Sequence, residues 1–206
     1  SSHMGYVLLG IACLTPLALN GAILLMFAHG IMTALAFALV GHVYDQTHTR
    51  YLPELGGLAH QLPFIAACGV IAAMASSGLP GFANFVAELL VFAGGWDNYP
   101  IPVICGVFGV VITAVYMLRF VRGTFFGELK PAFAHVRDAG SPFARLPYVI
   151  LTAVLLVVGC WPAPLLRLVD ASVRPFIERV VPPTPGRLAL PLPTSGLTAD
   201  SGRSIH

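Results

Sequence analysis

Charged side chains are scarce in this sequence. Asp, Glu, Lys and Arg make up only 10% of its 206 residues, whereas 57% are hydrophobic, and an ordinary soluble domain carries about 25% charged residues. Four long stretches contain no charged residue of either sign: 1–44, 55–87, 99–118 and 146–166. This distribution excludes a typical soluble domain and indicates an integral membrane protein.

Several kinds of functional site are excluded by what is missing. The net charge is only +2, and no basic stripe with interleaved aromatic residues is present, so nucleic-acid binding is not expected. The four cysteines stand alone in separate apolar segments, without the paired spacing of a zinc, iron–sulfur or disulfide site. Glycine-rich nucleotide loops, nucleophile elbows and carboxylate dyads are also lacking. We therefore expect no metal, no cofactor and no catalytic site in this chain.

The apolar stretches predict a bundle of membrane helices. A bilayer core about 30 Å thick requires roughly 20 apolar residues in helical conformation. Residues 3–14 are too short for a span, so we expect the chain to be a fragment that begins inside a helix. The predicted fold is an all-α polytopic membrane protein whose helical bundle covers residues 1–165, with helices at 3–14, 17–44, 62–96, 101–123 and 146–165.

The stretch 62–96 is too long for one straight membrane helix, because its 35 residues would extend about 52 Å. A break is predicted at Gly78-Leu79-Pro80-Gly81, since Pro80 removes a backbone donor and the two glycines permit non-helical angles. Two separate spans are the alternative, but each would have only about 15 residues, below the usual minimum of about 17. We therefore predict one discontinuous transmembrane helix, broken at 78–81.

The regions outside the bundle have a different composition. Residues 166–181 are apolar with interspersed arginines, a pattern typical of a helix lying on the membrane surface. Residues 182–206 are rich in proline and predict a disordered tail. The loop 119–145 carries five basic residues, which favours a cytoplasmic position for it.

Glu88 is the one charged residue within the predicted broken helix. An ionisable side chain at membrane depth costs at least about 2.5 kcal/mol on insertion scales, so such residues usually have a partner, a water cavity or a function. Loss of water favours the neutral acid, whereas the positive start of the second half-helix favours the carboxylate. We predict that Glu88 accepts and releases a proton; the alternative is a permanently protonated side chain that bonds a neighbouring helix.

His29 is the second candidate, in the middle of the helix predicted at 17–44. Thr33 follows one turn later on the same face and can hold a ring nitrogen or a water molecule. The near-neutral intrinsic pKa of histidine suits a proton relay. The alternative is a packed side chain satisfied by a backbone carbonyl.

Several strings of residues are distinctive together and in their order. They resemble chain M (subunit 4) of the proton-translocating NADH-quinone oxidoreductase, respiratory complex I, one of its antiporter-like membrane subunits. The similarity extends over about residues 1–165, and indicates that the first four residues are native although they look like a tag remnant. The strings are SSHMGYVLLGI, MFAHGIMTALAFALVGHVYDQTHTR, GGLAHQLP, SSGLPGFANFVAELLVFAGGW and TAVYMLRFVRGTFFGE.

The resemblance implies a role for the candidate residues. Glu88 falls in the motif FANFVAE, where sibling subunits have lysine, so it favours chain M over its paralogs. His29 matches the histidine of the family's MxxHG string, and Gly78, Pro80 and Gly81 match the elbow of its broken helix. The expected function is proton translocation in a bacterial inner membrane, with other membrane subunits, antiporter-like paralogs among them, as partners. The resemblance implies that the redox chemistry belongs to other subunits.

The chain also departs from the family pattern. It lacks the earlier helices, which contribute a glutamate and lysines to the proton path, so we expect that the chain alone does not translocate protons. Two other functions remain open. The chain could belong to a cation/proton antiporter or a membrane-bound hydrogenase complex, or it could be a non-conducting structural subunit that packs through small residues.

Overall fold

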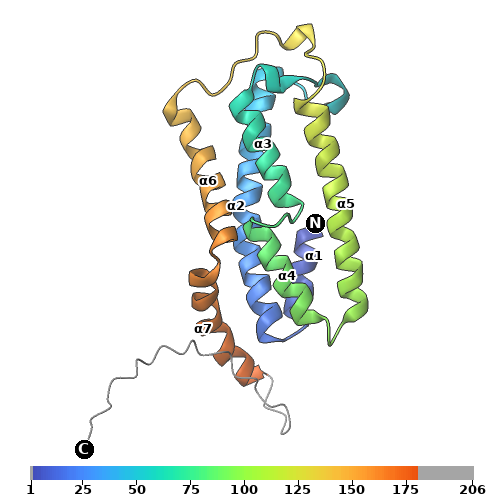
Figure 1. The fold of residues 1–206 in the computed structure, drawn as a ribbon, viewed down its shortest axis with the longest axis vertical. Coiled ribbons are helices and arrows are strands. Elements are labelled where there is room, and N and C mark those ends of the chain that lie inside the picture. Colours follow the sequence, from blue (N-terminus) through green and yellow to red (C-terminus); the bar gives the residue numbers. More distant parts are fainter. Residues whose placement is uncertain (1, 181–206) are drawn as a thin grey trace, which may run out of the picture.

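The structure, a computed structural model, describes residues 2–180, and all the regular elements in this range are helices (Figure 1). Val181 and the predicted tail at 182–206 lie outside the described residues. The helices are α1 (Ser2–Ala12), α2 (Pro16–Thr47), α3 (Pro63–Ser76), α4 (Ala83–Gly95), α5 (Pro100–Phe125), α6 (Pro142–Cys160) and α7 (Ala163–Val180), with short 3-10 turns at Leu52–Glu54, Leu58–His60 and Pro131–Phe133.

The long helices run side by side along the long axis of the molecule (Figure 1). Of the helices described, α2, α5 and α6 are long and apolar enough to cross a membrane. Helices α3 and α4 are individually too short, with 14 and 13 residues, and follow each other end to end along α2. The predicted class, a membrane helix bundle with one discontinuous helix, is confirmed.

Prolines and short polar caps set where the helices begin. Prolines occupy the first turn of α2, α3, α5 and α6, where the missing N–H costs no hydrogen bond. Thr15 and Ser141 cap α2 and α6 by accepting hydrogen bonds from Ala18 N and Ala144 N. Because Ser141 provides this cap, α6 begins at Pro142 rather than at residue 146.

Small residues allow α1 and α4 to lie very close to the first half of α2. A methyl group added at Gly21 would lie 2.7 Å from the backbone nitrogen of Val91, and one at Gly10 would lie 2.8 Å from the carbonyl oxygen of Ala18. Such close approach of backbones is the usual way in which membrane helices associate. The resulting apolar cluster includes Leu24, Leu25 and Val91, while a second cluster joins the other half of α2 to α3, α5 and α6.

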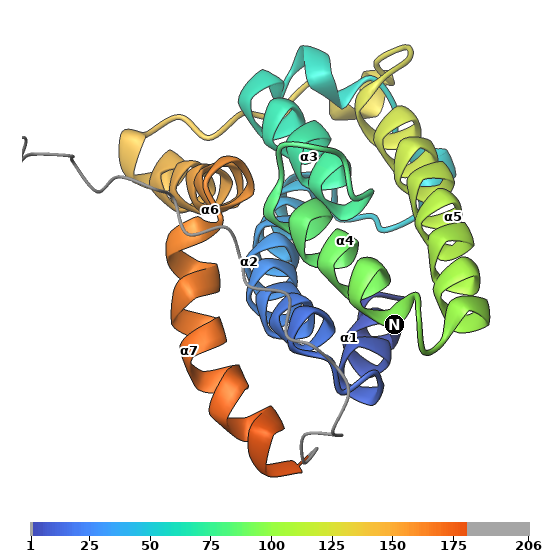
Figure 2. The ribbon, with the colours of Figure 1, turned by 60° about the horizontal axis from the view of Figure 1, so that its bottom comes forward.

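The last helix, α7, leaves the direction of α6 and runs along the side of α2 (Figure 2). Asp170 of α7 links the two helices, because its Oδ1 accepts a hydrogen bond of 2.8 Å from Nδ2 of Asn20, while Arg174 binds its other oxygen. Burial alone would raise the pKa of Asp170, but the hydrogen bonds from Arg174 and Asn20 hold this pKa below its ordinary value. The sequence predicted a surface segment at 166–181, and its position at the membrane surface stays a prediction.

We expect Asp170→Ala to loosen α7 from α2, since it removes the acceptor for Asn20. The free energy that holds α7 against α2 should fall by about 1 kcal/mol, the contribution of one hydrogen bond. The amides of α7 should then exchange with deuterium roughly five-fold faster. Acidification should act in the same direction. A carboxyl whose pKa is lowered by folding stabilises the docked state above the ordinary Asp pKa, and this stability is lost as the pH falls through the folded value. Glu178→Gln, at an exposed position of α7, is the control, and equal exchange in all three proteins would contradict the prediction.

Candidate functional site

The break between α3 and α4 provides the backbone of the candidate site. Helix α3 ends at Ser76 and α4 begins at Ala83, so the unwound segment contains the predicted Gly78, Pro80 and Gly81. Gly78 (φ 63°) and Gly81 (φ 99°) have left-handed backbone angles that glycine adopts without strain. The break therefore interrupts the helical hydrogen bonds at mid-height of the bundle, where Figure 1 shows the two helices meeting.

Glu88 lies in the second turn of α4 and points back toward the break. It is buried, with 4% of its surface exposed, and a methyl group added at Gly78 would collide with its Oε2 oxygen. A side chain at Gly78 would therefore be strained by the left-handed backbone and would displace the carboxyl group of Glu88. The glycine serves two purposes, the turn of the chain and the space for the carboxyl group.

His3 is the direct partner of Glu88, and the sequence analysis did not select it. Its Nε2 atom lies 3.5 Å from Oε1 of Glu88 and 3.2 Å from the carbonyl oxygen of Ser76, the last residue of α3. The imidazole is buried, with 5% of its surface exposed. The start of α1 thus reaches the break, and a hydrogen on Nε2 would face both a carboxyl and a carbonyl oxygen.

His29 of α2 extends this group across the bundle. Its ring stacks on that of His3, with 4.9 Å between the ring centroids and 25° between the ring planes. Its Nε2 lies 3.3 Å from Oγ1 of Thr33, as the spacing on one helix face predicted. Its Nδ1 is buried and has no hydrogen-bond partner among the described residues. The structure therefore brings three predicted residues, Glu88, His29 and Thr33, into one row with His3.

Asn84 adds an unsatisfied polar group near Glu88. It is fully buried in the first turn of α4, one helical turn before Glu88 and therefore on the same face. Neither its amide nitrogen nor its amide oxygen has a hydrogen-bond partner in the part of the chain that the structure describes. Buried amides normally have partners, and ordered water is a common one. Asn84 and Nδ1 of His29 are therefore suited to hold water beside the histidine–carboxyl pair.

The chemistry that this arrangement permits is proton exchange. Glu88 and the two histidines can each carry a proton, and the contacts between them cross from α4 to α1 and then to α2. Among residues 2–180, no group of three or more His, Cys, Asp or Glu side chains is placed to hold a metal ion. The groups present support acid–base exchange in a largely apolar environment.

The signal for His3 was available in the sequence. It is an ionisable residue at the start of a short apolar segment, but such a segment gives no measure of depth in a membrane. The depth of His3 follows from the fold. Helix α1 extends along only one half of α2, and its first turn lies beside the break (Figure 1). An ionisable residue in an apolar membrane segment is a functional candidate, which applies to His3 as it does to His29.

Known proteins are similar to this chain over most of its length. The NAD(P)H-quinone oxidoreductase chain 4 of Gloeobacter violaceus is 37% identical over 198 residues, which cover 88% of this chain and 38% of the relative. The NADH-quinone oxidoreductase subunit M of Pseudomonas aeruginosa is 37% identical over 173 residues, covering 84% of this chain and 33% of the relative. The chain thus spans about a third of the length of these curated relatives.

Solved structures share the fold. Respiratory complex I of Thermus thermophilus with bound NADH contains a chain that superposes with a TM-score of 0.78 at 29% identity, covering 85% of this chain and 37% of that one. A chain of the Mrp complex of a Dietzia species superposes with a TM-score of 0.76 at 24% identity, over 86% of this chain and 41% of that one, which shows the fold alone.

A sequence model of a protein family matches the part of the chain that contains the site. The sequence model described as NADH:quinone oxidoreductase/Mrp antiporter, transmembrane, matches residues 1–113. This range includes α1, α2, both halves of the broken helix and therefore His3, His29 and Glu88. The chain belongs to the transmembrane family of NADH:quinone oxidoreductases and Mrp antiporters.

Proposed function

We propose that the chain is part of a proton-translocating membrane subunit of a respiratory NADH-quinone oxidoreductase in a bacterial inner membrane. The observation that carries the proposal is the buried pair of Glu88 and His3, 3.5 Å apart at the break of a membrane helix. In transport proteins, ion and proton sites commonly lie at such breaks of a membrane helix. The relatives named above are chains of quinone oxidoreductases.

Each residue of the site has a distinct role in this proposal. Glu88 holds and releases the proton, and His3 exchanges it with the carboxyl group through Nε2. The ring of His29 stacks on that of His3, and Thr33 holds its Nε2. Because protons move through the ring nitrogens and not through the ring faces, a water molecule at Nδ1 of His29, which has no partner among the described residues, would continue the path. The break that leaves space for the carboxyl group is shaped by Gly78, Pro80 and Gly81. The redox reaction belongs to other subunits of the complex. The remaining proton-carrying groups belong to other membrane subunits, including antiporter-like paralogs, and to parts of the subunit beyond this chain.

Cation/proton antiport is the second candidate, because the family description itself includes the Mrp antiporters. The same row of groups would serve it, with a cation bound at Glu88 in place of a proton. The quinone oxidoreductase is favoured by the relatives at 37% identity, both of which are named as such.

The experiment that separates the two uses sealed vesicles containing the complete complex. We expect NADH and a quinone to drive acidification or alkalisation of the lumen, followed with a pH-sensitive dye, at the same rate in sodium-free and sodium-containing buffer. The reason is that imidazole and carboxyl groups exchange protons with each other directly, so the transfer needs no sodium ion. Proton movement that requires sodium, and that occurs without electron transfer, would support the antiporter and contradict the proposal.

A further inference from the structure

An apolar groove lies away from the proton site, between α2, α3, α5 and the loop after α2. Its volume is about 420 Å³. Its floor consists of small residues of α3, Gly69, Ala72 and Ala73. Its outer rim includes Val40 and Tyr116, whose side chains are 43% and 45% exposed. The groove is thus accessible from the outside of the bundle.

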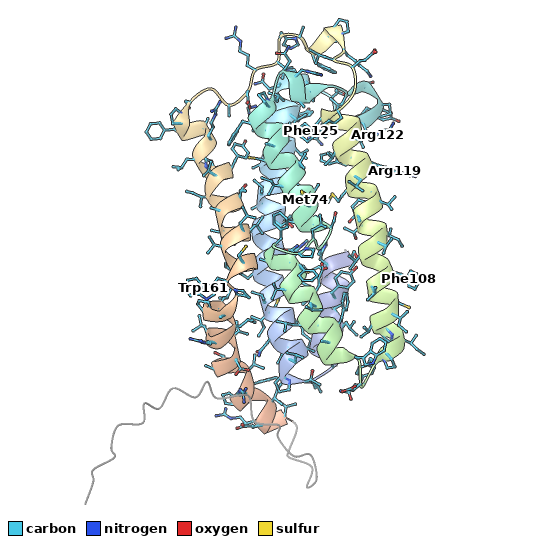
Figure 3. All side chains as sticks on the ribbon, in the orientation of Figure 1. Met74, Phe108, Arg119, Arg122, Phe125 and Trp161 are labelled. Carbon is cyan, nitrogen blue, oxygen red and sulfur yellow. The ribbon has the colours of Figure 1, made fainter. Side chains whose placement is uncertain are left out.

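The shape of the groove follows from the sequence of α3. A methyl group at Gly69 would lie 2.6 Å from the ring of Phe125, so this glycine allows the phenyl ring to pack directly against α3. Phe125, labelled in Figure 3, is 1% exposed and lines the groove at the end of α5. The alanines beyond it leave α3 too thin to fill the space between α2 and α5. The groove therefore lies over the small residues of α3, between α2 and α5.

Two polar side chains, Thr124 and Arg50, also line the groove. The hydroxyl of Thr124 lines it and is 1% exposed, yet its Oγ1 atom has no hydrogen-bond partner among the described residues. Arg50 also lines the groove, and its guanidinium lies 4.5 Å from the centroid of the Tyr44 ring. Within residues 2–180 Arg50 makes no ion pair, and Glu54 of the same loop accepts a hydrogen bond from Thr49 instead.

The size and polarity of the groove restrict its occupant. A partner helix about 10 Å across would fill 420 Å³ with only about 5 Å of its length, so the groove is too small for a helix. A thin alkyl chain fits the apolar walls. Thr124 can donate a hydrogen bond to an acceptor on the occupant, and Arg50 beside Tyr44 offers a cation at the level where aromatic side chains meet the membrane surface. An acyl chain, a carbonyl oxygen and an anion in that order are the parts of an anionic phospholipid.

We propose that this groove binds one molecule of an anionic glycerophospholipid. One acyl chain lies between α2 and α5 over Ala72 and Ala73, an ester carbonyl accepts a hydrogen bond from Thr124, and the phosphate pairs with Arg50. The lipid would hold α5 to α2 and α3 at a place where protein contacts leave a gap. None of the residues involved belongs to the proton site, so the inference is independent of the proposed function.

Native mass spectrometry of the chain purified in detergent tests the proposal, with phosphatidylglycerol as the probe. We expect one bound molecule, and about five-fold weaker binding for Arg50→Gln, since a basic residue near an anionic headgroup contributes roughly that factor. Thr124→Val keeps the volume of the side chain and should weaken binding by a similar factor, because only the hydrogen bond is lost. Arg119→Gln is the control, since this arginine lies on the outer side of α5 away from the groove (Figure 3) and should leave binding unchanged.

Each other outcome of this experiment would overturn the proposal. Equal binding by the wild type and both groove variants would place the lipid elsewhere. An equal loss in Arg119→Gln would show unspecific attraction to the positive surface. Displacement by millimolar inorganic phosphate would identify a site for free phosphate, and equal retention of phosphatidylcholine would show that Arg50 does not select the charge. Circular dichroism of every variant verifies that the helices are intact.

Discussion

Replacement of Glu88 by Gln is expected to abolish the proton transfer that passes through this chain while leaving the fold intact. Glutamine has nearly the same shape as glutamate and can still donate to or accept from a neighbour at the break, but it cannot bind and release a proton. Glu88 is 4% exposed, so bulk water has little access to take over its role. The loss of a positioned acid–base group typically slows a reaction by a factor of roughly 10²–10⁴.

The measurement is proton uptake into vesicles that contain the complete complex, normalised to the rate of electron transfer. Glu128→Gln is a matched control, because Glu128 is exposed beyond the end of α5 and the substitution is chemically identical. Unchanged proton uptake in an assembled Glu88→Gln complex would show a non-conducting, structural subunit. His3→Phe preserves an aromatic ring against His29 but removes Nε2, so we expect an intermediate rate from it.

The sequence predicted the broken helix and the placement of Glu88 beside it because both depend on local features. Proline and glycine interrupt a helix wherever they occur, and a charge in an apolar stretch is visible without knowledge of the fold. The pairing of His29 with Thr33 is equally local, and the structure places Thr33 Oγ1 3.3 Å from the ring. The helices themselves follow from the lengths of the apolar stretches.

The partners across helices could not be predicted in this way. His3 reaches Glu88 only because α1 packs along one half of α2 and brings its first turn to the break. Ser76 offers its carbonyl oxygen to His3 only because α3 ends there. The tie between Asn20 and Asp170 joins residues 150 positions apart in the chain. Such contacts depend on how the helices pack, which a single sequence does not encode in any short motif.

The packing of α6 against the break leads to the second large effect, the destabilisation expected from Gly159→Ala. A methyl group at Gly159 would collide with the carbonyl oxygen of Gly81 and lie 2.5 Å from Cα of Phe82. These are backbone atoms of the unwound segment, so they cannot move aside as the end of a flexible side chain can. Overpacking of this kind typically costs about 1–3 kcal/mol. The break would also shift, and with it the start of α4.

The control for this prediction is the same substitution at a glycine with free space around it. No atom lies within 4 Å of a methyl group at Gly41 of α2, so Gly41→Ala should be neutral or stabilise the helix by up to about 1 kcal/mol. Unfolding of both variants, followed by circular dichroism during titration from a mild detergent into dodecyl sulfate, should therefore give shifts of opposite sign. Equal stability of the two variants would mean that α6 does not press on the break. If instead Gly159→Ala alone is destabilised, the unwound segment is held in place by α6, and the position of Glu88 depends on a helix that contributes no proton-carrying group to the site.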